Sequence, residues 1–248
     1  MGSRLEAVIF DVDGTLVDSE RHGHRVAFND AFAAEGLPYS WDEETYGRWL
    51  SVHGGVRRIE AFLEEVGRPE AERRELADRL HAEKTRLLRE MIDAGRIPPR
   101  PGMVELLDHL ATSGVRLGVA TVGSAGWVNH LLGRLFPGAA FEVVVTGADV
   151  AEKKPHPGCY LQALKDMAVA PDAALAVEDS ATGLASARAA GLVCVVVRND
   201  YTADDDMTGA DLVLDGVDSE AGVLDDPHGL RPSLPLELGT LERLLATA

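Results

Sequence analysis

The chain has 248 residues, of which 46% are hydrophobic and 26% charged, and its formal net charge is −17. This length allows one large domain or two small ones with a substantial core. The negative charge argues against nucleic acids and anionic membranes as partners, and the sequence has no apolar run of about 18 residues that would cross a bilayer.

The first apolar segment is expected from about Leu5, which leaves no room for a signal peptide. The two cysteines, Cys159 and Cys194, are compatible with a reducing compartment. Cys194 lies within the apolar run 192–197 and is expected to be a small buried hydrophobic residue. We therefore expect a cytoplasmic protein.

Two carboxylates follow the first strand pattern. The apolar run over residues 7–10 is typical of a buried parallel strand, and Asp11 and Asp13 come directly after it. In extended backbone, residues two apart point the same way, so the two negative charges converge and require a cation. Gly14 comes too early for a calcium loop of the EF-hand type. If the ligand is a phosphate, a metal ion, helix N-termini and placed Lys or Arg residues must supply positive charge.

A helical block follows, with no strand pattern between residues 19 and 94. Four segments have the spacing of amphipathic helices: residues 19–35, a segment from near Asp42, a segment after Gly54 and Gly55, and residues 70–94. We expect a helical cap domain over residues 18–95, inserted into a core made of residues 1–17 and 96–248.

From residue 101 on, strand and helix patterns alternate. The strand patterns cover residues 115–121, 141–145, 174–177, 192–197 and 212–214. The helical patterns cover residues 103–110, the segment after Ser124, residues 157–167, 180–191 and 236–245, and residues 225–229 have the composition of a loop. Ser124 and Ser180 are expected to cap their helices, and Pro157 to occupy a first helical position. The alternation predicts an α/β fold with a doubly wound parallel sheet covered by helices on both faces.

Polar residues follow the ends of several of these strands. Parallel strands end at one edge of the sheet, where ligands bind in such folds. The residues that we expect to meet there are Asp11, Asp13, Thr121, Lys154, Glu178 and Asp179.

With these motifs in order, the chain resembles the haloacid dehalogenase superfamily of phosphotransferases. The motifs are Asp11-Val12-Asp13-Gly14-Thr15, Thr121, Lys154-Pro155, and Glu178-Asp179 followed by Ser180-Ala181-Thr182-Gly183. The resemblance covers residues from about 5 to 215 and implies a Rossmann-like core with a helical cap. It also implies Asp11 as the nucleophile that forms an aspartyl-phosphate, and Asp13 as general acid and then base.

The residue types suit this chemistry. A carboxylate can attack phosphorus without first losing a proton. Its repulsion by a phosphate dianion is about 4 kcal/mol per charge pair at ~4 Å and an effective dielectric constant of ~20. Mg²⁺ would remove that repulsion, and the expected metal-binding residues are Asp11, Glu178 and Asp179, together with Asp13 through its backbone carbonyl. The groups expected to hold phosphate oxygens are Lys154, Thr121, Ser124 and the backbone N–H of Val122.

Within the superfamily, the chain is similar to xylulose-1,5-bisphosphate phosphatases of the CbbY type. The stretches that carry this likeness are residues 23–29, 54–59, 81–85 and 151–155. The likeness implies that basic cap residues bind a second phosphate, and the implied substrate-binding residues are Asp18, His24, Gly55, Arg58 and Lys84. Val56 stands where these relatives have a lysine. Arg57 and Arg58 are adjacent in a predicted helix and cannot both face one site.

The leading hypothesis is a Mg²⁺-dependent phosphatase for a small phosphorylated sugar, with xylulose 1,5-bisphosphate favoured. A mutase of the β-phosphoglucomutase type shares the nucleophile and the cap, and a phosphoglycolate-type phosphatase is a further alternative. A dehalogenase is disfavoured because it needs no metal site, and a non-catalytic relative because Asp11, Asp13 and Asp179 are all present. We expect a monomer or a weak homodimer.

Overall fold

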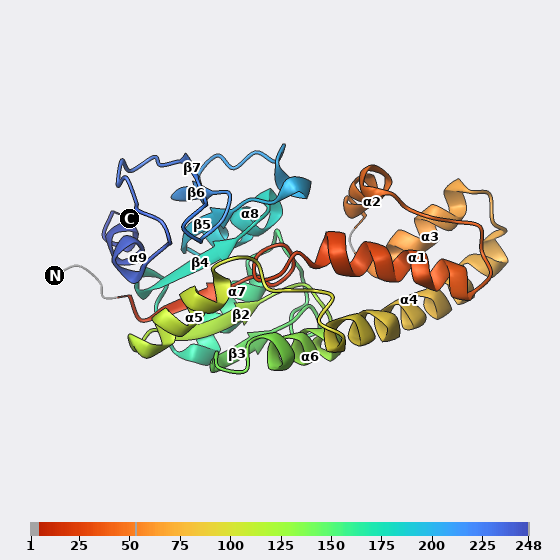
Figure 1. The fold of residues 1–248 in the computed structure, drawn as a ribbon, viewed down its shortest axis with the longest axis horizontal. Helices are drawn as coiled ribbons and strands as arrows, with labels where there is room; N and C mark the ends of the chain where they lie inside the picture. Colours follow the sequence, from red (N-terminus) through yellow and green to blue (C-terminus); the bar gives the residue numbers. More distant parts are fainter. Residues whose placement is uncertain (1–4, 53, 248) are drawn as a thin grey trace. The chain divides into compact units, whose positions relative to one another are not determined.

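The computed structural model describes residues 5–52 and 54–247, so the parts of the predicted core at residues 1–4 and 248 lie outside the described residues. The chain divides into two compact units (Figure 1). The core unit is formed by the chain up to Asp18 and again from Pro98, and the cap unit is Ser19–Ile97. Among the described residues, no helix combines the length and the apolar character that a membrane span requires.

One sheet of seven strands forms the described part of the core, in the order β3-β2-β1-β4-β5-β6-β7. The strands are β1 (Ala7–Phe10), β2 (Arg116–Ala120), β3 (Phe141–Val145), β4 (Ala174–Glu178), β5 (Val193–Val197), β6 (Leu212–Leu214) and β7 (Val223–Asp225). Neighbouring strands are parallel except β6 and β7. The predicted doubly wound α/β fold is confirmed.

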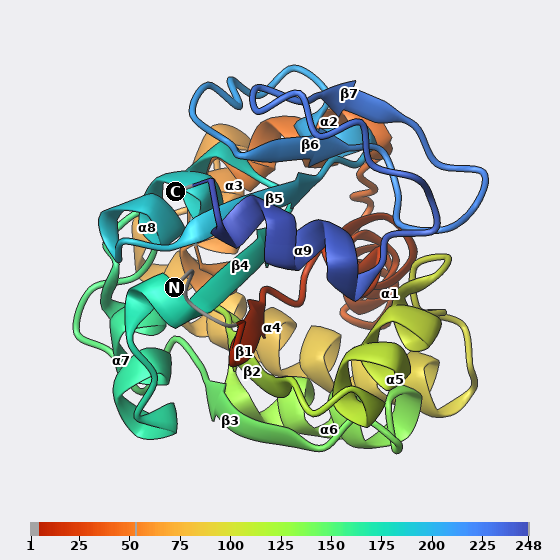
Figure 2. The same cartoon turned by 90° about the vertical axis from the view of Figure 1, so that its left-hand side faces the viewer.

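Helices cover both faces of this sheet. They are α5 (Met103–Thr112), α6 (Ala125–Leu135), α7 (Gly158–Met167), α8 (Ala181–Ala189) and α9 (Leu238–Leu245), with short 3₁₀ turns η2 (Pro171–Ala173) and η3 (Asp200–Thr202). Figure 2 shows α7 and α8 on one side of the sheet and α5, α6 and α9 on the other. Strands β1, β4 and β5 are buried along their whole length, as expected for strands covered on both faces.

The strand order reverses between β1 and β4. From β1 the chain moves outward to β2 and β3, and then crosses back to β4 and outward again to β5. In doubly wound sheets the crevice at such a switch point is the usual ligand site. The loops after β1 and β4 therefore frame the expected position of the site.

The helix starts in the core differ from one another. The Ser180 hydroxyl accepts a hydrogen bond from the Gly183 N–H at 3.1 Å and caps α8 as predicted. Ser124 stands at the N-cap position of α6, but its side chain makes no capping hydrogen bond. Pro157 precedes the first helical residue of α7, so the prediction that it opens the helix is wrong by one position.

The C-terminal part of the core contains a strand that the sequence pattern does not indicate. Strand β7 ends at Asp225, within the segment expected to be a loop, and its three residues are exposed. Two of them, Val223 and Leu224, are apolar but exposed, and so short a segment does not show the pattern of a buried strand. Helix α9 starts at Leu238, two residues after the predicted start, and packs against β4.

All the regular elements in the described residues of the cap unit are helical. The unit consists of a π-helical turn η1 (Glu20–His24) and helices α1 (Arg25–Ala34), α2 (Glu43–Leu50), α3 (Gly55–Glu65) and α4 (Glu70–Asp93). Its core is rich in aromatic rings, and the Trp41 ring meets Phe32 and Phe62 edge-on, each with centroids 5.0 Å apart. The single helix expected over residues 19–35 is thus divided into a π turn and α1.

Candidate active site

The nucleophile predicted from the sequence lies beside the acidic end of β4. The register of β1 and β4 pairs Phe10 with Val177, and the Asp11 N–H donates to the Val177 carbonyl at 3.0 Å. Asp11, which follows Phe10, and Glu178, which follows Val177, are therefore held side by side. Both side chains are buried, with 6% and 1% of their surface exposed.

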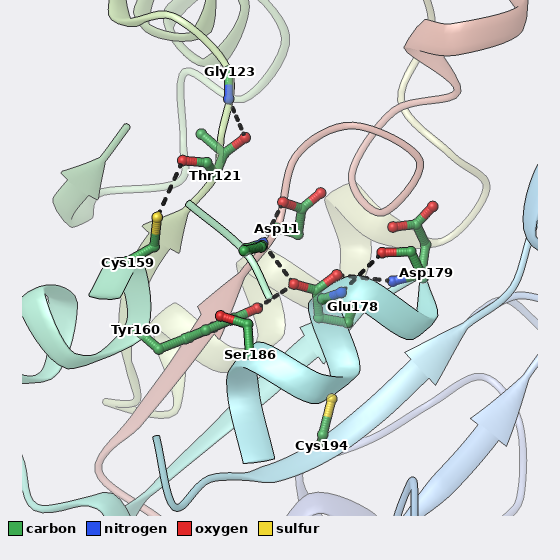
Figure 3. A network of polar contacts seen from close by, with 12 residues as sticks. Asp11, Thr121, Gly123, Cys159, Tyr160, Glu178, Asp179, Ser186 and Cys194 are labelled. Carbon is green, nitrogen blue, oxygen red and sulfur yellow. Dashed lines mark hydrogen bonds and ion pairs between the residues drawn. The ribbon is translucent and has the colours of Figure 1, made fainter. Parts of the chain in front are cut away.

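Asp11, Glu178 and Asp179 form a cluster of three buried carboxylates. Each of the three offers one carboxylate oxygen, and these three oxygens all lie within 4.8 Å of one another. Figure 3 shows the three side chains converging from the ends of β1 and β4. The Asp13 side chain is not a member of this cluster. The structure therefore brings together the side chains of Asp11, Glu178 and Asp179 from the predicted metal-binding set.

Lys154 connects two members of the carboxylate cluster. Its Nζ atom lies 2.6 Å from Asp11 Oδ1 and 2.6 Å from Glu178 Oε1, and the side chain is buried. Burial lowers the pKa of this ammonium group, but Asp11 and Glu178 together raise it above its ordinary value. Lys154 is thus held in its charged form.

Tyr160 completes the surroundings of Lys154 and Glu178. Its hydroxyl donates to Glu178 Oε1 at 2.6 Å, and its ring lies 5.0 Å from the Lys154 ammonium, within the range of a cation–π contact. Glu178 Oε1 therefore accepts from two donors, which fixes the orientation of the carboxylate.

One lysine does not balance the charge of the carboxylate cluster. Burial raises the pKa of Asp11 to about 8; Lys154 opposes this shift, and the charges of Glu178 and Asp13 add to it. Burial, Asp11 and Glu178 also raise the pKa of Asp179 well above its ordinary value. A further cation at this position would favour the ionised forms, and oxygen ligands of this kind suit Mg²⁺. The residues present therefore fit a magnesium ion.

Two glycines allow the cluster to be this compact. A Cβ atom on Gly183 would lie 1.9 Å from Glu178 Oε2, and one on Gly14 would lie 2.1 Å from Asp179 Oδ2. Gly14 also has φ +85°, a backbone conformation that other residues rarely adopt. The Gly in each of the two motifs is thus required by close approach to a carboxylate.

The residues after β2 lie at the same edge of the sheet. Thr121 is buried, and its hydroxyl oxygen accepts a hydrogen bond from the Gly123 N–H at 3.1 Å (Figure 3). Its hydroxyl proton can still be donated to a ligand. Val122 and Ser124, which follow Thr121, are exposed.

Asp13 and Asp18 belong to the loop that leaves β1. Asp13 is half-buried, and the loop turns sharply because the Gly14 N–H donates to the Val17 carbonyl at 2.8 Å. Asp13 lies close enough to Asp11 for its charge to raise the pKa of that residue. Asp18, also half-buried, is the last residue of the first core segment.

Three of the cap residues expected to bind substrate gather around His81. A Cβ atom on Gly55 would lie 2.5 Å from the His81 ring. Burial, then the charges of Lys84 and His24, lower the pKa of His81 to about 4. His81 is therefore neutral at physiological pH.

Arg58 is held by two residues of the aromatic core of the cap. Its Nε donates to the Trp49 carbonyl at 2.9 Å, and its Nη1 donates to the Tyr46 hydroxyl at 3.1 Å. Arg57 is exposed whereas Arg58 is buried. The two adjacent arginines therefore lie in different surroundings, in line with the prediction that they cannot both face one site.

Asn199 is a site residue that the sequence reasoning missed. Its Nδ2 donates to Asp179 Oδ2 at 2.7 Å and to the Gly14 carbonyl at 3.4 Å. It follows β5 by two residues, so the rule that places functional groups after parallel strands could have found it. Tyr160, inside α7, carries no such signal.

Comparisons with known proteins found a matching family and several similar proteins. The model of the haloacid dehalogenase-like hydrolase family matches residues 5–191. Protein CbbY from Rhodobacter capsulatus is 44% identical over 210 residues, covering 84% of this chain and 91% of that protein. A mutant of CbbY from Rhodobacter sphaeroides, crystallised with xylulose-(1,5)bisphosphate, is 40% identical with a TM-score of 0.76, covering 86% of this chain and 94% of the other. A putative β-phosphoglucomutase from Thermotoga maritima is 28% identical with a TM-score of 0.66, covering 82% and 88%.

These likenesses extend over both the sheet and the inserted helices. The predicted enzyme class, a phosphatase, is confirmed by the matching family and by the CbbY relatives. Because the family model spans well over half of the sequence, and because a relative 44% identical is covered over most of its length, the chain belongs to the haloacid dehalogenase-like hydrolases.

Proposed function

We propose that this enzyme is a Mg²⁺-dependent phosphatase that hydrolyses a small phosphorylated sugar through an aspartyl-phosphate, with xylulose 1,5-bisphosphate as the favoured substrate. The observation that carries the proposal is the cluster of three buried carboxylates, two of which, Asp11 and Glu178, are bridged by Lys154. Such a cluster can hold a divalent cation and thereby bind the anionic group on which a phosphatase acts.

Asp11 is the nucleophile in this proposal. One of its oxygens attacks the phosphorus atom, the bond from phosphorus to the sugar oxygen breaks, and Asp13 gives its proton to the departing oxygen. Asp13 then removes a proton from water, which attacks the same phosphorus atom and releases inorganic phosphate and free Asp11. Splitting one displacement into two is the advantage of covalent catalysis.

The other core residues hold and orient the phosphoryl group. Asp11, Glu178 and Asp179 would hold Mg²⁺ through their carboxylates and Asp13 through its backbone carbonyl, and the ion would supply positive charge that offsets the repulsion between the nucleophile and the phosphate. Lys154 orients Asp11 through the 2.6 Å ion pair. Thr121, Ser124 and the backbone N–H of Val122 donate hydrogen bonds to the transferring oxygens.

The proposed substrate rests on the likeness to CbbY and on the basic groups of the cap. Xylulose-(1,5)bisphosphate is the ligand of the Rhodobacter sphaeroides relative, which is 40% identical. Lys84 and His24, which lie close enough to His81 to lower its pKa, are proposed to recognise the far phosphate together with Arg58. Gly55 and Asp18 are the two further residues that are proposed to bind substrate.

The test is a Mg²⁺-dependent phosphate-release assay on a panel of substrates. The panel contains xylulose 1,5-bisphosphate, ribulose 1,5-bisphosphate, phosphoglycolate and β-glucose 1-phosphate. We expect kcat/KM for the xylulose compound to exceed the others by about a hundredfold, which corresponds to roughly 2.7 kcal/mol in the transition state. A flat profile would reject the substrate while leaving the chemistry in place.

A mutase is the second candidate, because the Thermotoga maritima structure is a putative β-phosphoglucomutase. The two reactions differ only in whether a sugar hydroxyl or water receives the phosphoryl group. Glucose 6-phosphate formed from β-glucose 1-phosphate would establish the mutase, and free phosphate from the xylulose compound would establish the phosphatase.

A further inference from the structure

Arg100 binds four backbone carbonyl groups next to the carboxylate cluster. Its Nη1 donates to the carbonyls of Gly14 at 2.5 Å and Val197 at 2.7 Å. Its Nη2 donates to the carbonyls of Arg198 at 2.7 Å and Asp215 at 3.0 Å. All four acceptors are backbone carbonyl oxygens, so the Arg100 side chain fixes the position of the backbone in these segments.

These four carbonyls belong to three separate segments of the core unit. Gly14 is in the loop that carries Asp11 and Asp13, Val197 and Arg198 lead from β5 to Asn199, and Asp215 follows β6. Arg100 also donates its backbone N–H to the Leu16 carbonyl at 2.9 Å. The side chain therefore joins the ends of β1, β5 and β6 at the edge of the sheet where the carboxylate cluster lies.

Two of the connected residues touch Asp179 directly. Asn199 donates to Asp179 Oδ2, and Gly14 packs so closely on the same oxygen that only a glycine fits. A displacement of either segment would move the Asp179 carboxylate relative to Asp11 and Glu178. Arg100 thus acts on the metal-binding set through Gly14 and Asn199, without touching it.

The chemistry of this position requires a guanidinium group. Four acceptors in two pairs match the planar fork of an arginine, whereas a lysine has three donors on a single atom. Burial lowers the pKa of Arg100, and the neighbouring charges of Asp179 and Asp18 oppose that effect. Arg100 therefore also places a positive charge near the acidic cluster.

We propose that Arg100 is a positioning residue that fixes Gly14 and Asn199 against Asp179 and thereby sets the affinity of the site for Mg²⁺. The inference rests on the proposed function, because it assumes that the carboxylate cluster binds this ion. The segment Arg100-Pro101-Gly102 connects the cap to α5, and its sequence alone does not indicate a role in the metal site. The inference gives it such a role.

The test compares direct Mg²⁺ binding and activity in two Arg100 variants and a matched control. Arg100→Met removes all four hydrogen bonds, and Arg100→Lys keeps the charge but not the fork. Arg243→Met is the control, because Arg243 also donates to backbone carbonyls, those of Leu230 and Gly239, in the same unit. Isothermal titration measures Mg²⁺ binding without substrate, and circular dichroism checks the fold.

We expect the Mg²⁺ dissociation constant to rise by about 10- to 100-fold in Arg100→Met, the range seen when outer partners of metal ligands are removed. Arg100→Lys is expected to weaken Mg²⁺ binding at least fivefold, and this variant decides the question if Arg100→Met does not fold. Most of the lost kcat should return at saturating Mg²⁺, and Arg243→Met should bind Mg²⁺ as the wild type does.

A folded Arg100→Lys variant that binds Mg²⁺ within twofold of the wild type would overturn the inference. An equal loss in Arg243→Met would also overturn it, because the effect would then be general destabilisation. Failure of the proposed function has a different signature, since wild-type enzyme would then show no Mg²⁺-dependent phosphate release at all.

Discussion

Removing Mg²⁺ should make the stability of the enzyme strongly pH-dependent. Without the ion, one buried lysine, Lys154, faces the three carboxylates and forms ion pairs with only two of them, Asp11 and Glu178. The pKa of Asp11 is then about 8 in the folded protein, against an ordinary value of 3.8. A carboxyl group with a raised pKa contributes its full stability below its unfolded pKa, and this contribution is lost as the pH rises through the folded pKa.

The size of the effect follows from this shift. A difference of about four pKa units corresponds to a loss on the order of 5 kcal/mol between roughly pH 4 and pH 8. The raised pKa of Asp179 acts in the same direction. Bound Mg²⁺ favours the ionised carboxylates and offsets this loss by roughly 2.7 kcal/mol when its concentration is a hundred times its dissociation constant.

Urea unfolding at about pH 5.5, 7 and 8.5, with EDTA and with Mg²⁺, measures this dependence. The free energy of unfolding should be nearly equal in the two solutions at the lowest pH, and the Mg²⁺ series should exceed the EDTA series by about 2 to 3 kcal/mol at the highest. Asp11→Asn is the matched control, and its gap should be smaller and less dependent on pH. A gap of constant size in the wild type would refute the reasoning.

Three further substitutions test the surroundings of the carboxylates. Lys154→Met leaves Asp11 and Glu178 without their counter-charge and should lower the free energy of unfolding in EDTA by about 3 to 5 kcal/mol; wild-type stability in urea would contradict this. Gly183→Ala should destabilise α8 and weaken Mg²⁺ binding in a calorimetric titration because of the clash with Glu178. Gly133→Ala, in open space on α6, should instead stabilise by up to about 1 kcal/mol, and equal effects would argue against the clash. Ser180→Ala removes the cap of α8 and should cost about 1 kcal/mol in thermal unfolding, so an unchanged Tm would exclude the capping role.

The strands and the carboxylate cluster follow from local patterns. Apolar runs indicate the buried strands, and the rule that functional groups follow parallel strands places Asp11, Thr121 and Asp179 at one edge. The same rule would have reached Asn199 if the residues after β5 had been considered. Sequence information therefore accounts for the parts of the site that lie next to a strand end.

Contacts between distant segments are not visible in such patterns. Arg100 and Val197 are 97 positions apart, and neither belongs to a motif. Tyr160 is a buried aromatic residue in an amphipathic helix, and its hydrogen bond to Glu178 depends on how α7 packs on the sheet. Long-range polar contacts of this kind become predictable only when the fold is known.

Local exceptions to regular structure were also missed. A Cβ atom on Gly23 would lie 2.6 Å from Ile97 Cδ1, so the close packing of the π turn on the end of the cap segment depends on this glycine. Strand β7 has three exposed residues, and its hydrogen bonds with β6 rather than apolar burial define it. In both cases tertiary packing outweighs the periodicity that a sequence displays.

Covalent labelling of Asp11 tests the proposed mechanism most directly. The enzyme would be mixed with xylulose 1,5-bisphosphate and Mg²⁺, quenched in acid within milliseconds, digested, and analysed by mass spectrometry. We predict a phosphoryl group on the peptide that contains Asp11, lost on treatment with hydroxylamine and absent from Asp11→Asn. Full turnover by folded Asp11→Asn, or a phosphoryl group on any other residue, would contradict the assignment of Asp11 as the nucleophile.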